Sequence, residues 1–261
     1  MSVFESDGFL SEEISEFEAP AAEQYGEKLE LASDANRQAH TLIYSIQIHN
    51  EHLPDILLAT ILARQAAAFQ SFYLLLRKGL FYQSQILLRN IAENMFTIGA
   101  SRKDPEFPGK FVLSEEVTRK KSLDALVRDE TSRGNTVDQE VLDLIATLEA
   151  KIEQEGITTY RTERIAQIAE LSSYYDTLYR LTSISVHTSS RGLDSALETD
   201  DDGAITAVTY EPIFDGLDMY LDYGISMMLY SLHEIASHFE RPVDEIEALQ
   251  ARNQELAGPT N

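Results

Sequence analysis

The stretch YQSQILLRNIAENMFTIGA, residues 82–100, decides the fold class. Its apolar residues recur at helical spacing and cover more than one face of the predicted helix: Ile86, Leu87, Leu88, Ile91, Ala92, Met95, Phe96 and Ile98. A helix that is apolar on several faces needs packing partners on several sides. The stretch therefore predicts the central helix of a helical bundle.

The surrounding chain has the same periodicity. Further helices are predicted at residues 23–49, 55–77, 111–130, 138–154, 163–170, 172–189 and 212–240. Only AITAVTY, residues 204–210, alternates and is rich in β-branched side chains, as a strand would be. We therefore predict an all-α, single-domain, multi-helix bundle with at most one short extended segment.

The two ends of the chain differ from its middle. Residues 1–20 are acidic, with isolated aromatic side chains, and predict a loosely docked N-terminal arm. Residues 21–241 hold the bundle, and residues 242–261 predict a polar helix or tail. No segment between the helices is long enough, or rich enough in Pro or Ser, to be an interdomain linker.

Charge and cysteine content exclude several functions. The 44 Asp and Glu residues against 21 Lys and Arg residues give a formal charge of −23. Such an acidic surface repels phosphate backbones, so bulk DNA binding is not expected, although a local Arg cluster can still hold one phosphate. Because the chain has no cysteine, a disulfide framework, a thiolate metal site and a cysteine nucleophile are excluded.

The N-terminal segment and the apolar runs predict a cytoplasmic protein that does not bind membranes. The first twenty residues lack the basic and apolar regions of a secretory signal. No apolar run reaches spanning length without charges. The last long helix, for example, carries Asp215, Asp218 and Asp222, which favours a core helix over a membrane span.

Spacings typical of metal and cofactor sites are scarce. No Glu lies three residues before a His, as a ferritin-like di-iron bundle requires. His233 and His238 are five residues apart, so their imidazoles diverge by about 140° on a helix. His49 and His52 share a face but have no evident third ligand. Glycine-rich nucleotide loops and a Gly-x-Ser-x-Gly elbow are also absent, so we predict neither a metal nor a cofactor.

One candidate polar pair lies inside the most apolar helix. Arg89 and Glu93 are four residues apart, so they share a helix face and can form an ion pair. A purely structural interpretation is that the pair fixes the register of the helix. A functional interpretation stays open, because a buried ion pair costs stability relative to apolar replacements.

A second candidate set lies in YYDTLYRLTSISVHTS, residues 174–189. Arg180 and His187 fall within about 20° of one helix face. Three hydroxyl-bearing residues repeat every four positions beside them: Tyr175, Tyr179 and Ser183. The structural interpretation places the tyrosine rings in the core with hydrogen-bonded hydroxyls and His187 at a helix C-terminus. The functional interpretation is a site lined by these groups.

Together these two segments resemble a large bacterial family of uncharacterised helical proteins, a domain of unknown function. Its members look like an apolar helix with Leu-x-Arg-x-x-x-Glu, followed about ninety residues later by Tyr-x-x-x-Tyr-Arg-x-x-Ser-x-x-x-His. The matching residues here are Leu87, Arg89, Glu93, Tyr175, Tyr179, Arg180, Ser183 and His187. The resemblance covers about residues 55–240 and implies no established activity.

The spacing from Arg180 to His187 is also similar to the Arg-x4–6-His signature of the HEPN superfamily. That superfamily includes metal-independent ribonucleases of toxin, defence and stress systems, whose Arg and His act on the RNA backbone near a dimer interface. The resemblance implies that His187 takes the proton of a 2′-hydroxyl while Arg180 stabilises charge on the phosphate. Arg89, held by Glu93, would be a second phosphate donor. This chain is longer and more acidic than those proteins.

Two hypotheses for the function follow. The first is a non-catalytic helical interaction or regulatory protein, an accessory of a bacterial defence or stress system, in which the polar residues form an internal network. The alternative is a HEPN-like, metal-independent RNA endonuclease that uses Arg180 and His187 and is compatible with a homodimer. The expected partner is accordingly another protein or RNA.

Overall fold

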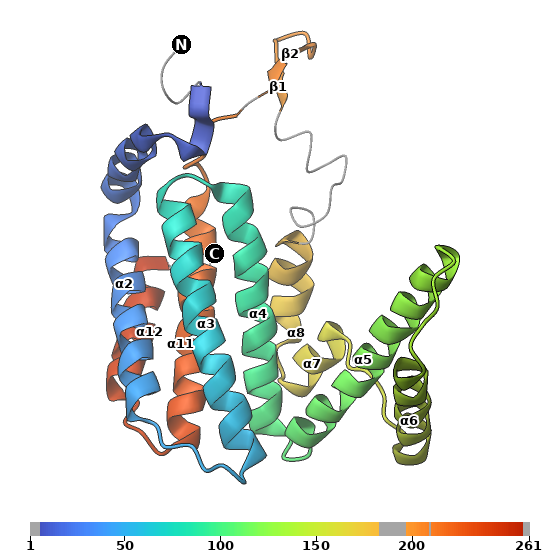
Figure 1. Cartoon of the computed structure of the whole chain (residues 1–261). Helices are drawn as coiled ribbons and strands as arrows, with labels where there is room; N and C mark the ends of the chain where they lie inside the picture. The colour runs from blue at the N-terminus through green and yellow to red at the C-terminus, as the bar shows by residue number, and fades with distance from the viewer. Residues whose placement is uncertain (1–5, 183–196, 209, 258–261) are drawn as a thin grey trace.

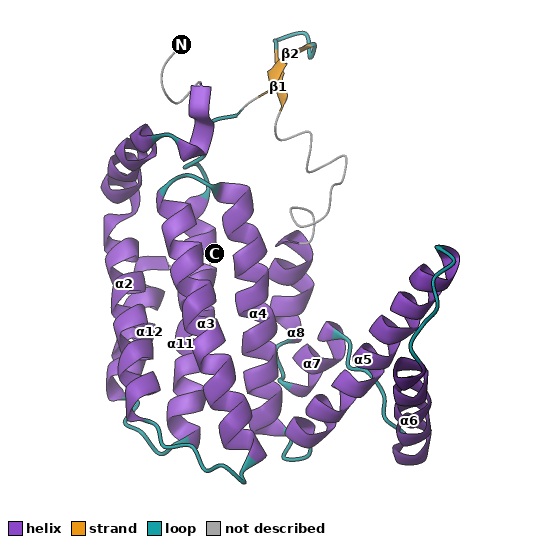
Figure 2. Ribbon diagram, viewed as in Figure 1, coloured by secondary structure: helices purple, strands orange, loops and turns teal. Residues whose placement is uncertain are grey.

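The computed structural model describes residues 6–182, 197–208 and 210–257, and most of them are helical (Figures 1 and 2). The long helices are α2 (Glu18–Ser45), α3 (Leu53–Arg77), α4 (Phe81–Lys103), α5 (Phe107–Ser132), α6 (Gln139–Glu155), α11 (Leu217–His238) and α12 (Asp244–Ala257). The short ones are η1 (Gly8–Leu10), η2 (Glu12–Phe17), α7 (Thr162–Ile168), α8 (Ser172–Tyr174) and η3 (Tyr175–Tyr179). The predicted all-α bundle is confirmed.

The extended segment expected at 204–210 has a strand partner. Strand β2 (Ile205–Val208) pairs antiparallel with β1 (Leu197–Thr199), and the register pairs Leu197 with Val208. The hairpin lies apart from the helical bundle (Figure 2). Every residue of β2 is exposed, so the hairpin adds little to the core.

Helices α2, α3, α4 and α11 form the bundle, and α12 returns along α2 and α11 (Figure 1). Helix α4 contacts α3, α11 and α7, which explains why its sequence is apolar on several faces. Leu88, Ile91, Phe96 and Ile98 are fully buried. The stretch that predicts the fold is therefore the centre of the core.

Two glycines allow close contact between core elements. A Cβ atom at Gly224 of α11 would lie 2.6 Å from the Phe72 ring of α3. A Cβ atom at Gly99 of α4 would lie 2.9 Å from both the Cβ of Ala169 and the hydroxyl of Tyr230. Both distances are too short for carbon contacts, so glycine sets how closely the helices approach.

Helices α5 and α6 form a hairpin that extends away from the bundle, here called the arm (Figure 1). At its base, Phe107 is fully buried and its ring lies 5.3 Å from the Phe111 ring and 5.2 Å from the Tyr160 ring. Gly156, in the left-handed conformation, ends α6. The helices predicted at residues 111–130 and 138–154 thus lie outside the bundle.

Helix boundaries differ from the predicted ones in two places that matter for the candidate sites. Helix α2 ends at Ser45, so His49 lies in a connection and not in a helix. The helix expected at 172–189 begins as α8 and continues as the π-helical turn η3, and residues 183–189 lie outside the described part. Within the described residues, no helix combines the length and the apolar character needed to cross a membrane.

Candidate functional site

The structure brings Arg89, Glu93 and Tyr179 into contact. The Nη2 of Arg89 donates a hydrogen bond to the Tyr179 hydroxyl at 2.5 Å, and that hydroxyl donates to the Oε1 of Glu93 at 2.8 Å. The Nε of Arg89 lies 3.4 Å from the same carboxylate oxygen. The guanidinium also lies 4.2 Å from the centre of the Tyr179 ring. These contacts attach η3 to α4.

Aromatic rings cover one side of this network. The Tyr175 ring stacks on the Tyr179 ring with centroids 5.1 Å apart, and Phe96 lies 6.2 Å from Tyr179. Burial raises the pKa of the Tyr179 hydroxyl, and the hydrogen bond to Glu93 raises it further. The Arg89 and Glu93 side chains are 20% and 41% exposed, so the network is half-buried. The three polar groups therefore bind one another.

Arg180 lies apart from this network. Its side chain is 62% exposed, forms an ion pair with Asp176 at 3.4 Å and lies over the Tyr175 ring. Consecutive helical residues are about 100° apart, so Arg180 and Tyr179 point to different sides of the helix. Ser183 and His187 lie outside the described residues, so the predicted pairing of Arg180 with His187 stays a prediction.

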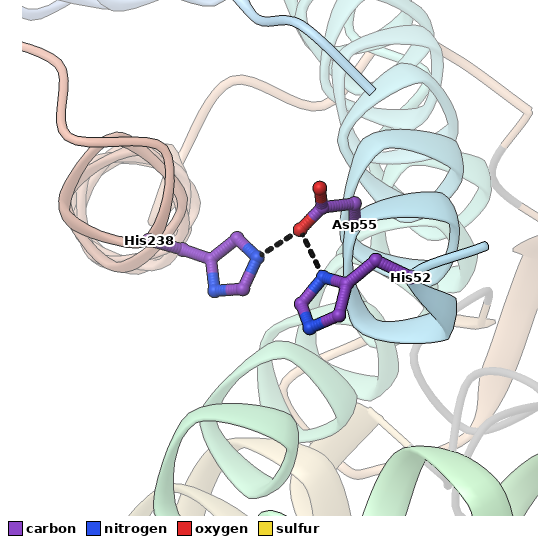
Figure 3. Close-up of side chains that lie close together, drawn as sticks. All are labelled: His52, Asp55 and His238. Atoms are coloured by element: carbon purple, nitrogen blue, oxygen red, sulfur yellow. Dashed lines mark hydrogen bonds and ion pairs between the residues drawn. The ribbon is translucent and has the colours of Figure 1, made fainter. Parts of the chain in front are cut away.

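A second polar cluster lies at the end of the bundle where α2 joins α3 and α11 joins α12 (Figure 3). Asp55 accepts hydrogen bonds from three imidazoles. The Nδ1 of His52 and the Nε2 of His238 lie 2.6 and 2.7 Å from its Oδ1. The Nδ1 of His49 lies 2.6 Å from its Oδ2, to which the His49 backbone N–H also donates at 3.3 Å. We call these four residues the His–Asp cluster.

Local sequence explains where these groups lie. Helix α3 begins at Leu53, and Pro54 and Asp55 lie in its first turn, where free N–H groups and the helix dipole favour a carboxylate. His52 caps the same helix, and His238 ends α11. The rings of His52 and His238 are nearly parallel, with centroids 6.1 Å apart. Two helix ends thus present imidazoles to one carboxylate.

The Asp55 carboxylate is buried, with only 6% of its side chain exposed. Burial alone would raise its pKa, but the hydrogen bonds from His49, His238 and His52 outweigh that effect and hold the pKa well below its ordinary value. Four donors occupy the lone-pair positions of an ionised carboxylate. The charge of Asp55 is therefore stabilised by its imidazole partners.

Arg102 determines which nitrogen of His238 carries the proton. The Nη1 of Arg102 lies 3.3 Å from the Nδ1 of His238. A guanidinium can only donate, so this Nδ1 accepts and Nε2–H donates to Asp55. Arg102 also pairs with Glu234, its Nε lying 3.5 Å from the carboxylate. The imidazole of His238 therefore has partners on both sides.

The His–Asp cluster lies in a cleft of about 620 Å³, which Gln47, Phe239, Glu240 and Arg241 also line. The side chains of His49 and His52 are 71% and 56% exposed, so their rings are open to the cleft. Potential ligand atoms of His52, Asp55 and His238 all lie within 4.8 Å of one another. Imidazole nitrogens with a carboxylate oxygen are a donor set that suits zinc and similar ions.

Sequence reasoning found only part of this cluster. The pair His49 and His52 is visible, and Asp55 continues the same three-residue spacing at the start of a predicted helix. His238 carries no local signal toward them, because it is 183 residues from Asp55. Its angle to His233 excludes that pair on a helix but says nothing about partners on other helices.

The fold and the clusters define an all-helical bundle protein with a polar cleft at one end. Residues 55–204 match a family described as a family of unknown function, DUF5677. The match covers more than half of the chain, so the chain belongs to this family. Comparison with curated proteins found no match, and comparison with solved structures found none either. The predicted membership of an uncharacterised family is confirmed.

Proposed function

We propose that this chain is a ligand-responsive regulatory protein and that the cleft at the His–Asp cluster is its ligand site. One observation carries the proposal. A single buried carboxylate holds imidazoles from two chain connections, the α2–α3 connection and the end of α11. These groups are far apart in the sequence, and they meet where the cleft opens.

A ligand in this cleft contacts two connections at once. Residues 46–52 lead into α3, and residues 239–243 lead into α12, which packs on α2. Glu240, in the second connection, has a φ angle of 53°, which is unfavourable for any residue other than glycine. A ligand that favours one arrangement of the connections shifts the population toward it. The long helices carry that change away from the cleft.

The regulatory role agrees with the first hypothesis from the sequence. An accessory role in a bacterial defence or stress system, a protein partner and a cytoplasmic location stay predictions from the sequence. A ligand bound in the cleft would be the signal to which such a regulator responds.

The proposal is tested by hydrogen exchange with mass spectrometry and by thermal shift, using Zn²⁺, Mg²⁺, inorganic phosphate, citrate and AMP as separate probes. We expect at least one probe to raise the melting temperature and to slow exchange in both 46–52 and 239–243. The double variant His52→Ala/His238→Ala should lose this response. The exposed His40, which bonds Gln70, supplies the control variant His40→Ala, which should keep it.

Three results would overturn the proposal. The first is that none of the five probes slows exchange in either connection. The second is a response limited to one connection. A response that survives the double substitution would place the ligand elsewhere.

The alternative function, a HEPN-like RNA endonuclease, keeps a separate test. The exposure of Arg180 supports it to the extent that its guanidinium is open to an RNA backbone. If His187 is the general base, His187→Ala should abolish RNA cleavage in the presence of EDTA and leave the melting temperature unchanged. Cleavage that requires a divalent metal, or that survives the substitution, would contradict this mechanism.

A further inference from the structure

Resting on the proposed regulatory function, we infer that the ligand of the cleft is a divalent transition-metal ion of the zinc class. Its protein ligands are the Nδ1 of His52, the Nε2 of His238 and one carboxylate oxygen of Asp55. The fourth position faces the cleft and takes water or a small ligand.

The geometry needs only a small change to accept such an ion. The two imidazole nitrogens now lie at hydrogen-bond distances, 2.6 and 2.7 Å, from the Oδ1 of Asp55. Ligand atoms around a tetrahedral zinc ion are about 3.4 Å apart, given bonds of about 2.0–2.1 Å. Each contact must therefore open by roughly 0.7 Å. His52, which is 56% exposed, has room to rotate into the cleft.

The other oxygen of Asp55 is already held in place. Its Oδ2 accepts from the imidazole and the backbone N–H of His49. Such outer hydrogen bonds orient a metal-binding carboxylate and leave its first oxygen for the ion. His49 is thus a positioning residue for the site.

Charge and donor type select the class of ion. Two neutral imidazoles and one carboxylate favour zinc-like ions, whereas Mg²⁺ and Ca²⁺ prefer sites made of oxygen. Asp55 is the only carboxylate among these three ligands, and the chain as a whole carries −23. A negative protein field raises the local concentration of divalent cations.

Arg102 opposes binding of the ion. Coordination through the Nε2 of His238 moves the ring proton to Nδ1, which now faces the Arg102 guanidinium at 3.3 Å. Two donors would then face each other. Arg102 must turn away for the metal to bind, and its existing ion pair with Glu234 offers a place to turn. Removing the Arg102 guanidinium should therefore strengthen metal binding.

The experiment is titration calorimetry of the full, metal-free chain with ZnCl₂, supported by a competing chromophoric chelator. We expect one zinc ion per chain. Asp55→Asn and His52→Ala/His238→Ala should each weaken binding at least tenfold, and Arg102→Met should strengthen it several-fold. His40→Ala should leave it unchanged. Circular dichroism checks that each variant folds.

A spectroscopic measurement covers variants that fail to fold. Co²⁺ added to the wild-type chain should give the visible absorption of a tetrahedral site, and zinc should shift the ring-nitrogen NMR signals of His52 and His238. No zinc binding, binding unaffected by the double substitution, or unshifted ring signals would overturn the inference. Weaker binding in Arg102→Met would overturn the opposing role of Arg102.

Failure of this inference and failure of the proposed function give different results. If zinc binds through His52 and His238 but exchange in 46–52 and 239–243 stays the same, the metal site stands and the regulatory function falls. If zinc does not bind but another probe slows exchange through these histidines, the regulatory function stands and the metal site falls.

Discussion

Replacing Asp55 by Asn tests the hydrogen-bonded His–Asp cluster directly when a chelator keeps metal away. The amide keeps the size of the side chain but removes its charge. Its NH₂ group is a donor, and it would face imidazole N–H donors. Its amide oxygen can still accept from His238 and His52 but without the charge, and the NH₂ group then faces the two N–H donors of His49.

The expected magnitude follows from the exposure of each partner. His49 and His52 are 71% and 56% exposed, so they can turn to water and their contacts contribute little. His238 is only 14% exposed, and its bond weakens from that to a charged acceptor, about 1.5–3 kcal/mol, to that to a neutral one, about 0.5–1.5 kcal/mol. The buried NH₂ group that faces the donors of His49 costs about 1–3 kcal/mol more. Removing a negative charge from the first turn of α3 adds about 0.3–1 kcal/mol. We expect Asp55→Asn to lower the free energy of unfolding by about 2–4 kcal/mol.

The assay is urea denaturation followed by circular dichroism at neutral pH with EDTA. The matched control is Glu51→Gln, which removes the same charge from an exposed side chain in the same connection. It should change the free energy of unfolding by less than about 0.5 kcal/mol. A loss below about 1 kcal/mol in Asp55→Asn, or equal losses in both variants, would refute the reasoning.

Three further outcomes are expected. Arg89→Ala should lower the free energy of unfolding by about 1–2 kcal/mol in urea denaturation, because the Arg89 side chain is still 20% exposed and that of Glu93 41% exposed. A loss above about 3 kcal/mol would indicate a fully buried ion pair. Gly224→Ala should cost about 1–3 kcal/mol in the same assay, because its Cβ would lie 2.6 Å from Phe72, whereas Gly26→Ala, with nothing within 4 Å, should be neutral or stabilising. Burial raises the pKa of Tyr230 to about 12, so the stability linked to its neutral hydroxyl is complete below pH 10 and is lost as the pH rises through about 12. Tyr230→Phe should therefore show a smaller loss of stability between these pH values, and an unchanged pH profile would contradict the shift.

The architecture was predictable because the buried positions of a helix are apolar and recur at helical spacing in the sequence. Residues 82–100 are apolar on several faces, and α4 contacts several elements. The π-helical turn at Tyr175–Tyr179 was not predictable, since the α-helical rotation per residue was assumed throughout.

The candidate sites were predictable only where the contact is local. Arg89 and Glu93 pair within one helix, at a spacing that can be read directly. The contact between Asp55 and His238 depends on how α3 and α11 lie beside each other, which no spacing reports. The packing of α3 against α11, and not a local sequence motif, brings His238 to Asp55.

The arm has a consequence for how this chain tolerates changes in length. Helices α4 and α7 contact each other, although the whole arm lies between them in the sequence. In α5 and α6, burial is limited to Phe107, Pro108 and Ser114 near the base and Leu148 farther out. Insertions, deletions or a grafted module in the outer arm therefore leave the bundle core intact. A shortened arm would still leave its two ends close enough for a brief loop to join them.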